Sequence, residues 1–174
     1  MRINAVDRSE YADFYAGYLA QVDAEYTLVE ELEISLHRLI HFVRDIPMDK
    51  FDYRYAEGKW TIKDILQHLL DSERVFAYRA LCIARHDQTA FPGFDEDFYV
   101  ANAEANRRSI QDLLTEFTAL RQANLCLFKS FSQEALLRMG TASGHPVSVR
   151  ALGFMIIGHQ NHHLNVFQQR YLKE

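Results

Sequence analysis

The sequence predicts an all-α protein in which four long helices form a bundle. Only three prolines and seven glycines interrupt the 174 residues, and the strand-like alternation of apolar and polar residues is absent. Apolar residues instead recur at spacings of three and four, which places them along one face of a helix. Four such segments joined by loops are typical of a helix bundle. We therefore expect residues 1–174 to form one domain, in which residues 1–22 are a Tyr-rich arm laid across the bundle.

Composition and charge exclude several classes of protein. About half of the residues are apolar, enough for a proper core in a chain of this length. The net charge is −5 and no basic patch is evident, which argues against nucleic-acid binding. The longest apolar run, ALGFMIIGH, is too short to cross a bilayer, and the N-terminal residues are too acidic and polar for a signal peptide. We expect a cytoplasmic protein that binds neither nucleic acid nor membrane.

The first long helix is predicted over residues 25–46, and Pro47 ends it. His37 and His41 lie at the margin of its apolar stripe, where a structural or solvent-facing role is expected. The stripe follows alternating spacings of three and four through Val29, Leu32, Leu36, Leu39, Val43 and Ile46.

The other three helices have clear start signals. Thr61 and Asp64 form a capping-box-like pair that begins the second helix, which is predicted to run to about residue 85. The third is predicted over residues 102–130, and the fourth after Pro146 with Ser148 as its N-cap. The apolar side of the third helix is predicted to hold Ile110, Leu113, Phe117, Leu120, Leu127 and Phe131.

The two cysteines are predicted to be core residues rather than reactive thiols. Cys82 and Cys126 each lie in helix-like sequence beside apolar residues. This setting predicts small buried thiols rather than a disulfide or a cysteine-based metal site.

Two histidines interrupt the apolar stripe of the fourth helix. His159 and His163 are four residues apart, so they are stacked on one helix face. A buried imidazole needs hydrogen-bond partners or a metal, because leaving it without either costs about 1–3 kcal/mol. Such a pair alone is more often a pair of core histidines than a metal site.

His68 changes that balance, because it lies on the edge of the apolar face of the second helix. Three inward imidazoles could supply the three protein ligands of an open, catalytic type of metal site. His68 lies about 10 Å into its helix and His163 about 12 Å from the end of the fourth, so they share a level only if the two helices are antiparallel. The hypothesis therefore predicts a long crossover through residues 86–101, between the second and third helices.

A metal held by three neutral imidazoles lowers the pKa of bound water or thiol and generates a nucleophile at neutral pH. Cys82 is about 21 Å along the helix from His68, so a reacting thiol would come from a cosubstrate. Asp71, three residues after His68, is the candidate general base or outer-shell carboxylate. An ordinary surface carboxylate paired with Arg74 is an equally good interpretation of Asp71.

Further residues are candidates for the pocket around such a site. Ser72 follows His68 on the same side of the second helix, and Tyr55 and Trp60, just ahead of that helix, could wall the pocket or be core aromatics. Arg79 could anchor an anionic substrate, although a structural ion pair is the commoner role. His162 is about 100 degrees around the helix from His163, which makes it a pocket candidate rather than a ligand.

Three stretches of the chain share their pattern with a known family: YAEGKWTIKDILQHLLDSERVFAYRALCIARHD, PGFDEDFYV and GHQNHHLNVFQQRYL. Through them the sequence resembles the DinB superfamily of YfiT-like metalloenzymes over nearly its whole length. The resemblance implies a four-helix bundle with up-down-down-up topology. It also implies a divalent metal, commonly nickel or zinc, held by His68, His159 and His163. Some relatives resemble transferases or isomerases that use low-molecular-weight thiols such as bacillithiol or mycothiol, and others are described as hydrolases.

Three functions remain open from the sequence. The leading one is a metal-dependent enzyme, a hydrolase or a thiol transferase, that activates water or a small thiol against a small-molecule substrate. The rival is a stress-response or binding protein with a structural metal, for which a closed site with a fourth ligand such as Asp71 or His145 would be expected. A dimerisation module, with the Tyr-rich arm as its interface, is the third, and a homodimer is therefore an open alternative.

Overall fold

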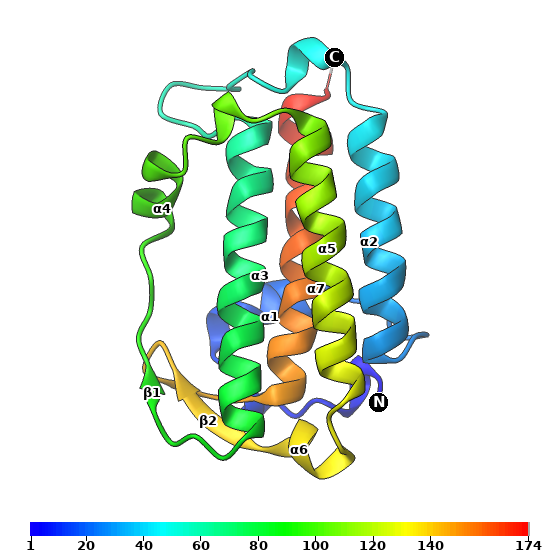
Figure 1. Ribbon diagram of the computed structural model, residues 1–174, viewed down its shortest axis with the longest axis vertical. Helices are drawn as coiled ribbons and strands as arrows, with labels where there is room; N and C mark the ends of the chain where they lie inside the picture. Colours follow the sequence, from blue (N-terminus) through cyan, green and yellow to red (C-terminus); the bar gives the residue numbers. More distant parts are fainter. Residues whose placement is uncertain (174) are drawn as a thin grey trace.

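The computed structural model describes residues 1–173, and its four long helices run up, down, down and up (Figure 1). They are α2 (Leu28–Arg44), α3 (Ile62–Ala84), α5 (Ile110–Lys129) and α7 (Val149–Val166). Helices α2 and α3 each pack against both α5 and α7. Because α3 runs down and α7 runs up, these two neighbours are antiparallel. The connection between α3 and α5 returns along the length of the bundle. The predicted four-helix bundle and its crossover are confirmed.

Side-chain caps set where the helices begin. Thr27 and Thr61 each open a helix in a capping box, with Glu30 and Asp64 as the respective partners. Ser148 caps α7, as the sequence predicts.

The third predicted helix begins eight residues too early. In its place the crossover forms the short helix α4 (Glu96–Asn102) and a 3-10 turn (Ala105–Arg107) before α5 starts. Glu104 between them adopts a left-handed backbone conformation with φ of 50°, which ends α4. The last helical turn among residues 1–173, Phe167–Tyr171, is π-helical.

A small sheet at one end of the bundle was not predicted. It comprises β1 (Ala90–Phe91), β2 (Met139–Ala142) and β3 (His145–Ser148). Ser143 and Gly144, with φ of 53° and 79°, form the two-residue turn between β2 and β3. Strand β1 pairs in parallel with β2 and so ties the crossover to the base of α7. Strands of two to four residues are too short to show alternation in the sequence.

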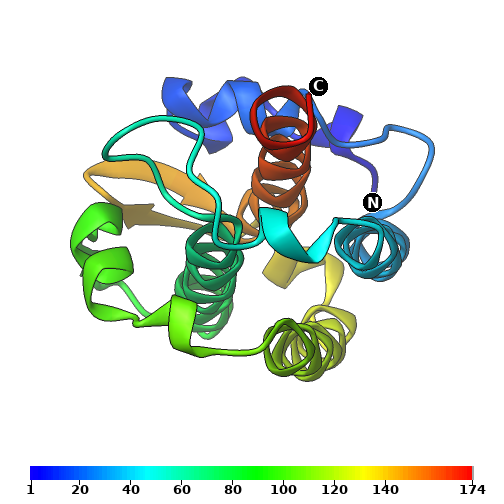
Figure 2. The same cartoon turned by 90° about the horizontal axis from the view of Figure 1, so that it is seen from above.

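The N-terminal arm lies across α7, as Figure 2 shows in blue. It is built from 3-10 turns and the single helical turn α1 (Ala16–Leu19). The arm approaches α7 at Gly158, where an added Cβ would lie 2.2 Å from the backbone oxygen of Tyr18. Only glycine allows this approach of two backbones. An ion pair between Arg150 and Glu10, 2.7 Å from Nε to Oε2, fastens the arm a second time.

The core consists of two apolar clusters, one in each half of the bundle. A layer of buried polar side chains from all four helices separates them, centred on Arg121, which is completely buried. The prediction of two buried thiols is wrong for Cys126, which is exposed, whereas Cys82 is half-buried. Across residues 1–173, none of the helices has the length and apolarity needed to cross a membrane.

Candidate metal centre

The three predicted ligands converge at the interface between α3 and α7. The Nε2 atom of His159 lies 3.0 Å from Nε2 of His68 and 3.1 Å from Nε2 of His163. All three ring nitrogens lie within 4.8 Å of one another. One helix supplies His68, and the four-residue spacing on α7 stacks the other two on one face. The antiparallel packing that the histidine hypothesis required brings them to one level.

Hydrogen bonding alone does not account for this arrangement. The Nε2 atom of a neutral imidazole carries either one proton or one lone pair, so it forms one good hydrogen bond. Nε2 of His159 has two other ring nitrogens at hydrogen-bond distance. A cation between the three nitrogens would use all three lone pairs at once, so the residues fit a divalent metal.

The electrostatics favour the same conclusion. Burial lowers the pKa of His68 to about 4, although the charge of Asp97 acts in the opposite direction. Burial, reinforced by the neighbouring imidazoles, lowers the pKa of His159 and His163 well below the usual value. All three rings are therefore neutral at pH 7 and present lone pairs, which is the form that binds metals. Three imidazoles suit zinc, nickel and copper alike.

A cavity of about 440 Å³ opens beside the three imidazoles. The ring of Tyr18 lies 5.1 Å from that of His159, and the ring of Trp60 lies 4.9 Å from that of His68. Burial raises the pKa of Tyr15 and Tyr18, so both phenols stay protonated. The aromatic side chains of this wall are Phe14, Tyr15, Tyr18, Trp60, Phe76 and Phe94.

Two carboxylates of α4, Glu96 and Asp97, line the same cavity. Sequence reasoning missed them as site residues, and it also missed Tyr18. The only signal for the carboxylates was the acidic stretch DEDFY in the crossover. No spacing pattern points to Tyr18, because the packing of the arm at Gly158 places it there.

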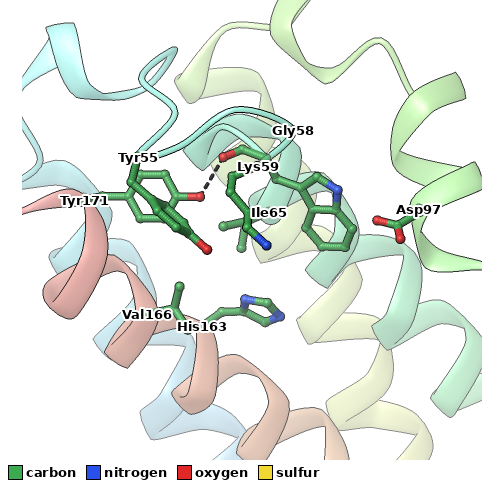
Figure 3. A pocket seen from close by; sticks show the side chains of 9 residues that line it. Tyr55, Gly58, Lys59, Ile65, Asp97, His163, Val166 and Tyr171 are labelled. Carbon is green, nitrogen blue, oxygen red and sulfur yellow. Dashed lines mark hydrogen bonds between the residues drawn. The ribbon is translucent and has the colours of Figure 1, made fainter.

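His163 also lines a second cavity, of about 390 Å³. Figure 3 shows Tyr55, Lys59 and Asp97 around it, with the apolar side chains Ile65 and Val166. His163, Trp60 and Asp97 line both cavities, which therefore adjoin at the histidine cluster.

The predicted pocket residues are distributed among several cavities. Ser72 and His162 line the cavity beside the imidazoles, Trp60 lines both neighbouring cavities, and Tyr55 lines only the second. Arg79 lies elsewhere, in a separate cavity of about 370 Å³, where its guanidinium donates to the carbonyl of Pro92 at 2.5 Å. No carboxylate of residues 1–173 forms an ion pair with Arg79.

The structure places Asp71 away from the imidazoles. Its carboxylate accepts a hydrogen bond from Gln67 at 3.0 Å and lies 3.8 Å from Arg74. It is absent from the described lining of both cavities that adjoin the cluster. His145 is exposed and packs against the ring of Phe14. Within residues 1–173, neither provides a fourth ligand to the cluster.

The remaining histidines of the chain lie outside the site. His37 and His41 on α2 are exposed, as expected for solvent-facing residues. His86 is also exposed and ends α3 with a positive φ of 65°.

Comparison with known proteins agrees with this architecture. The model of the DinB superfamily matches residues 31–167, which include all three histidines. Among curated proteins, none is similar enough in sequence to count as a relative.

Two solved structures from Bacillus subtilis are similar in fold. YfiT, described as a probable metal-dependent hydrolase with an unusual four-helix bundle topology, superposes with a TM-score of 0.76 at 15% identity. That match covers 94% of this chain and 90% of YfiT. The DinB-like protein YjoA superposes with a TM-score of 0.56 at 20% identity, over 84% of this chain and 92% of YjoA.

Proposed function

The chain belongs to the DinB superfamily, and from this premise we propose that it is a metal-dependent hydrolase of small molecules. The observation that carries the proposal is the convergence of three neutral imidazoles beside an accessible cavity. A structural site would be closed by a fourth protein ligand, and the cluster among residues 1–173 has only three members. The relative YfiT, described as a probable metal-dependent hydrolase, supports the same reaction class.

Different residues of the chain would have different roles in hydrolysis. His68, His159 and His163 would hold the metal, and burial keeps them unprotonated. When bound, a divalent metal with open positions polarises a substrate carbonyl and lowers the pKa of water. The aromatic side chains of the cavity wall would shield the reacting atoms from bulk water once a substrate is bound, which strengthens the electrostatic interactions there.

Two kinds of polar group are available for the substrate. The hydroxyl of Ser72 is buried without a hydrogen-bond partner and lines the cavity, so it is free to donate to a substrate oxygen. Glu96 and Asp97 line the same cavity, and their carboxylates are suitable proton acceptors.

A thiol transferase differs from this proposal only in the nucleophile. Neither Cys82 nor Cys126 is among the described residues that line the two cavities at the cluster. A thiol would therefore enter as a cosubstrate, and the same metal would lower its pKa. Substrate screening distinguishes the two reactions directly.

The first test is the metal content of untagged protein grown with trace metals, measured by elemental analysis. We expect about one divalent metal per chain, and none in His163→Ala. His162→Ala is the matched control, because His162 lines the same cavity but lies outside the cluster. Equal metal contents in wild type and His163→Ala would contradict the site.

The second test is activity. Metal-loaded protein is assayed with small esters and amides, with and without an added low-molecular-weight thiol. Hydrolysis that needs the metal and no thiol supports the proposal, whereas turnover only with thiol assigns the chain to the transferases. A loaded protein inactive in both assays would favour the non-catalytic rival.

A further inference from the structure

The cavity beside His163 contains an ammonium group without a counter-ion. Figure 3 shows the Lys59 ammonium and the Tyr55 hydroxyl pointing into this cavity. Within residues 1–173, Lys59 has no carboxylate at ion-pair distance, whereas its neighbour Lys63 pairs with Asp52 at 3.0 Å. An unpaired cation aimed into a cavity favours a negatively charged ligand.

The loop that carries Lys59 is held in place. Arg54 donates to the carbonyl of Lys59 and pairs with Asp64 at 3.1 Å from its other terminal nitrogen. Gly58 adopts a φ of 72°, which lets the chain turn immediately before Lys59. The backbone under the lysine is therefore fixed, and its side chain has a defined base from which to reach the cavity.

Neighbouring side chains complete the cavity. The Tyr171 hydroxyl donates to the backbone oxygen of Trp60 at 2.6 Å, and burial raises the pKa of Tyr171, so this bond persists at neutral pH. The Tyr171 hydroxyl is thus occupied, and Tyr55 is the phenol that faces the cavity. Ile65 and Val166 provide apolar surface between the polar groups.

Charge is divided across the cavity. Asp97 lines the cavity on the side opposite Tyr55 in the view of Figure 3, and its charge raises the pKa of His68 against the effect of burial. Lys59 lies on a different wall, and the two charges do not pair. A ligand with an anionic group at Lys59 would therefore extend away from it toward the cluster.

We propose that this cavity binds the carboxylate end of an organic acid, which pairs with Lys59 and accepts a hydrogen bond from Tyr55. The substrate body would contact Ile65 and Val166, and its reacting group would lie at the histidine cluster beside His163. One ammonium and one phenol match a monoanion, whereas a phosphate dianion is usually met by more cations. This assignment of substrate class rests on the proposed hydrolase function, but the binding of the carboxylate does not.

The binding test uses the fluorescence of Trp60, the single tryptophan of the chain, which lines both cavities. Zinc-loaded protein is titrated with hexanoate and with the neutral hexanamide. We expect Lys59→Met to weaken hexanoate binding by about 10-fold or more and to leave hexanamide binding unchanged. Lys129→Met, at the exposed end of α5, is the matched control and should change neither.

A carboxylate that binds the zinc directly would keep its affinity in Lys59→Met, and this result would overturn the proposal. Equal weakening of hexanoate and hexanamide would overturn it as well, because the lysine would then act on the shape of the cavity. Titration of metal-free His163→Ala with the same two ligands is expected to retain the dependence on Lys59.

Kinetics separate this proposal from the proposed function. The two ester substrates are 4-nitrophenyl butyrate and the mono-4-nitrophenyl ester of glutaric acid, which carries a free carboxylate. We expect a lower KM for the acidic ester, and loss of that advantage in Lys59→Met. If neither ester is hydrolysed but hexanoate binding depends on Lys59, the hydrolase proposal fails and the carboxylate site stands. Hydrolysis of both esters with the same KM in wild type and Lys59→Met would overturn the carboxylate site alone.

Discussion

Two groups of buried polar side chains include adjacent residues of helices α3 and α7, and the two groups differ in how completely their hydrogen bonds are satisfied. Toward the bundle centre, Arg121 is completely buried and donates five hydrogen bonds. Two of these go to the carboxylate of Glu73 at 2.8 and 2.9 Å. The others reach Leu32, Ser35 and Gln160 at 2.7–2.9 Å. Every N–H of the guanidinium has an acceptor.

The histidine cluster lies on the neighbouring side of the same helices. Ser72 precedes Glu73 and His159 precedes Gln160, so adjacent residues contribute to different groups. In the cluster, three ring nitrogens face one point, and the Ser72 hydroxyl and Nδ1 of His163 lack partners. A native interior leaves few such groups unsatisfied. The contrast indicates that the closed network stabilises the bundle, whereas the open one leaves polar atoms available to a ligand.

The largest expected effect comes from opening the closed network. Arg121→Met should lower the free energy of unfolding by about 3–5 kcal/mol, because it leaves the charge of Glu73 buried without a partner. Urea unfolding of the metal-free protein measures this. Adding Glu73→Leu should restore much of the loss, since a buried ion pair can be replaced by apolar residues. A loss below 1 kcal/mol for Arg121→Met alone would show that the network carries little stability.

The histidine cluster should make the free energy of unfolding depend on pH. The pKa of His68 is near 4 in the folded protein and near 6.5 unfolded, so between these values the unfolded chain binds more protons. Protonation of His68 therefore has no effect on the free energy of unfolding above pH 6.5. As the pH drops toward 4, it lowers this free energy by roughly 3 kcal/mol. Unfolding of the protein with chelator, from pH 7 to 4, measures the slope.

His68→Gln provides the control for that slope, because other groups also titrate in acid. The variant should lose stability less steeply than the wild type below pH 6.5. Parallel curves for the two proteins would mean that burial of His68 does not suppress its protonation.

A bound metal should make the histidine cluster contribute to stability, as the Arg121 network does. With free zinc at 100 times its dissociation constant, the wild type should gain about 2.7 kcal/mol in unfolding free energy. His159→Ala should gain little, whereas Arg121→Met should gain as much as the wild type if it stays folded. Thermal unfolding with and without zinc measures this, and an equal gain in His159→Ala would place the metal elsewhere.

A substitution at the contact between the N-terminal arm and α7 tests whether the histidine cluster needs the arm in order to bind a metal. Gly158→Ala places a Cβ against the backbone oxygen of Tyr18, and overpacking of this kind costs about 1–3 kcal/mol. We expect lower stability in urea but unchanged metal content, because the arm contributes no histidine to the cluster. Gly17→Ala, which meets nothing within 4 Å, should cost less. Loss of metal in Gly158→Ala would show that the arm holds the ligands in place.

Helical periodicity explains why the histidine cluster could be predicted from the sequence. His159 and His163 share a helix face because they are four residues apart. The same periodicity places His68 on the apolar face of a helix whose N-cap, Thr61, can be recognised from the sequence. Antiparallel helices α3 and α7 then follow from the requirement of a common level.

Features that depend on tertiary packing were not visible in the same way. Tyr18 reaches the cluster only because Gly158 lets two backbones approach. Arg121 received no role from the sequence pattern, because its buried partners come from three other helices. The burial of α5 is therefore rotated toward Leu114 and Phe128 from the stripe that apolar spacing alone indicated.

The smallest expected effect concerns Asp71, for which the sequence left two interpretations open. The spacing of three from His68 allowed a catalytic carboxylate or a surface partner of Arg74, and the side chain accepts from Gln67 and lies near Arg74. Burial raises the pKa of Asp71, so its charge is not strongly stabilised there. Asp71→Asn should leave metal content and kcat/KM within about two-fold and stability within about 0.5 kcal/mol. Asp97→Asn, beside the imidazoles, should reduce kcat/KM more, and the reverse order would return Asp71 to the catalytic site.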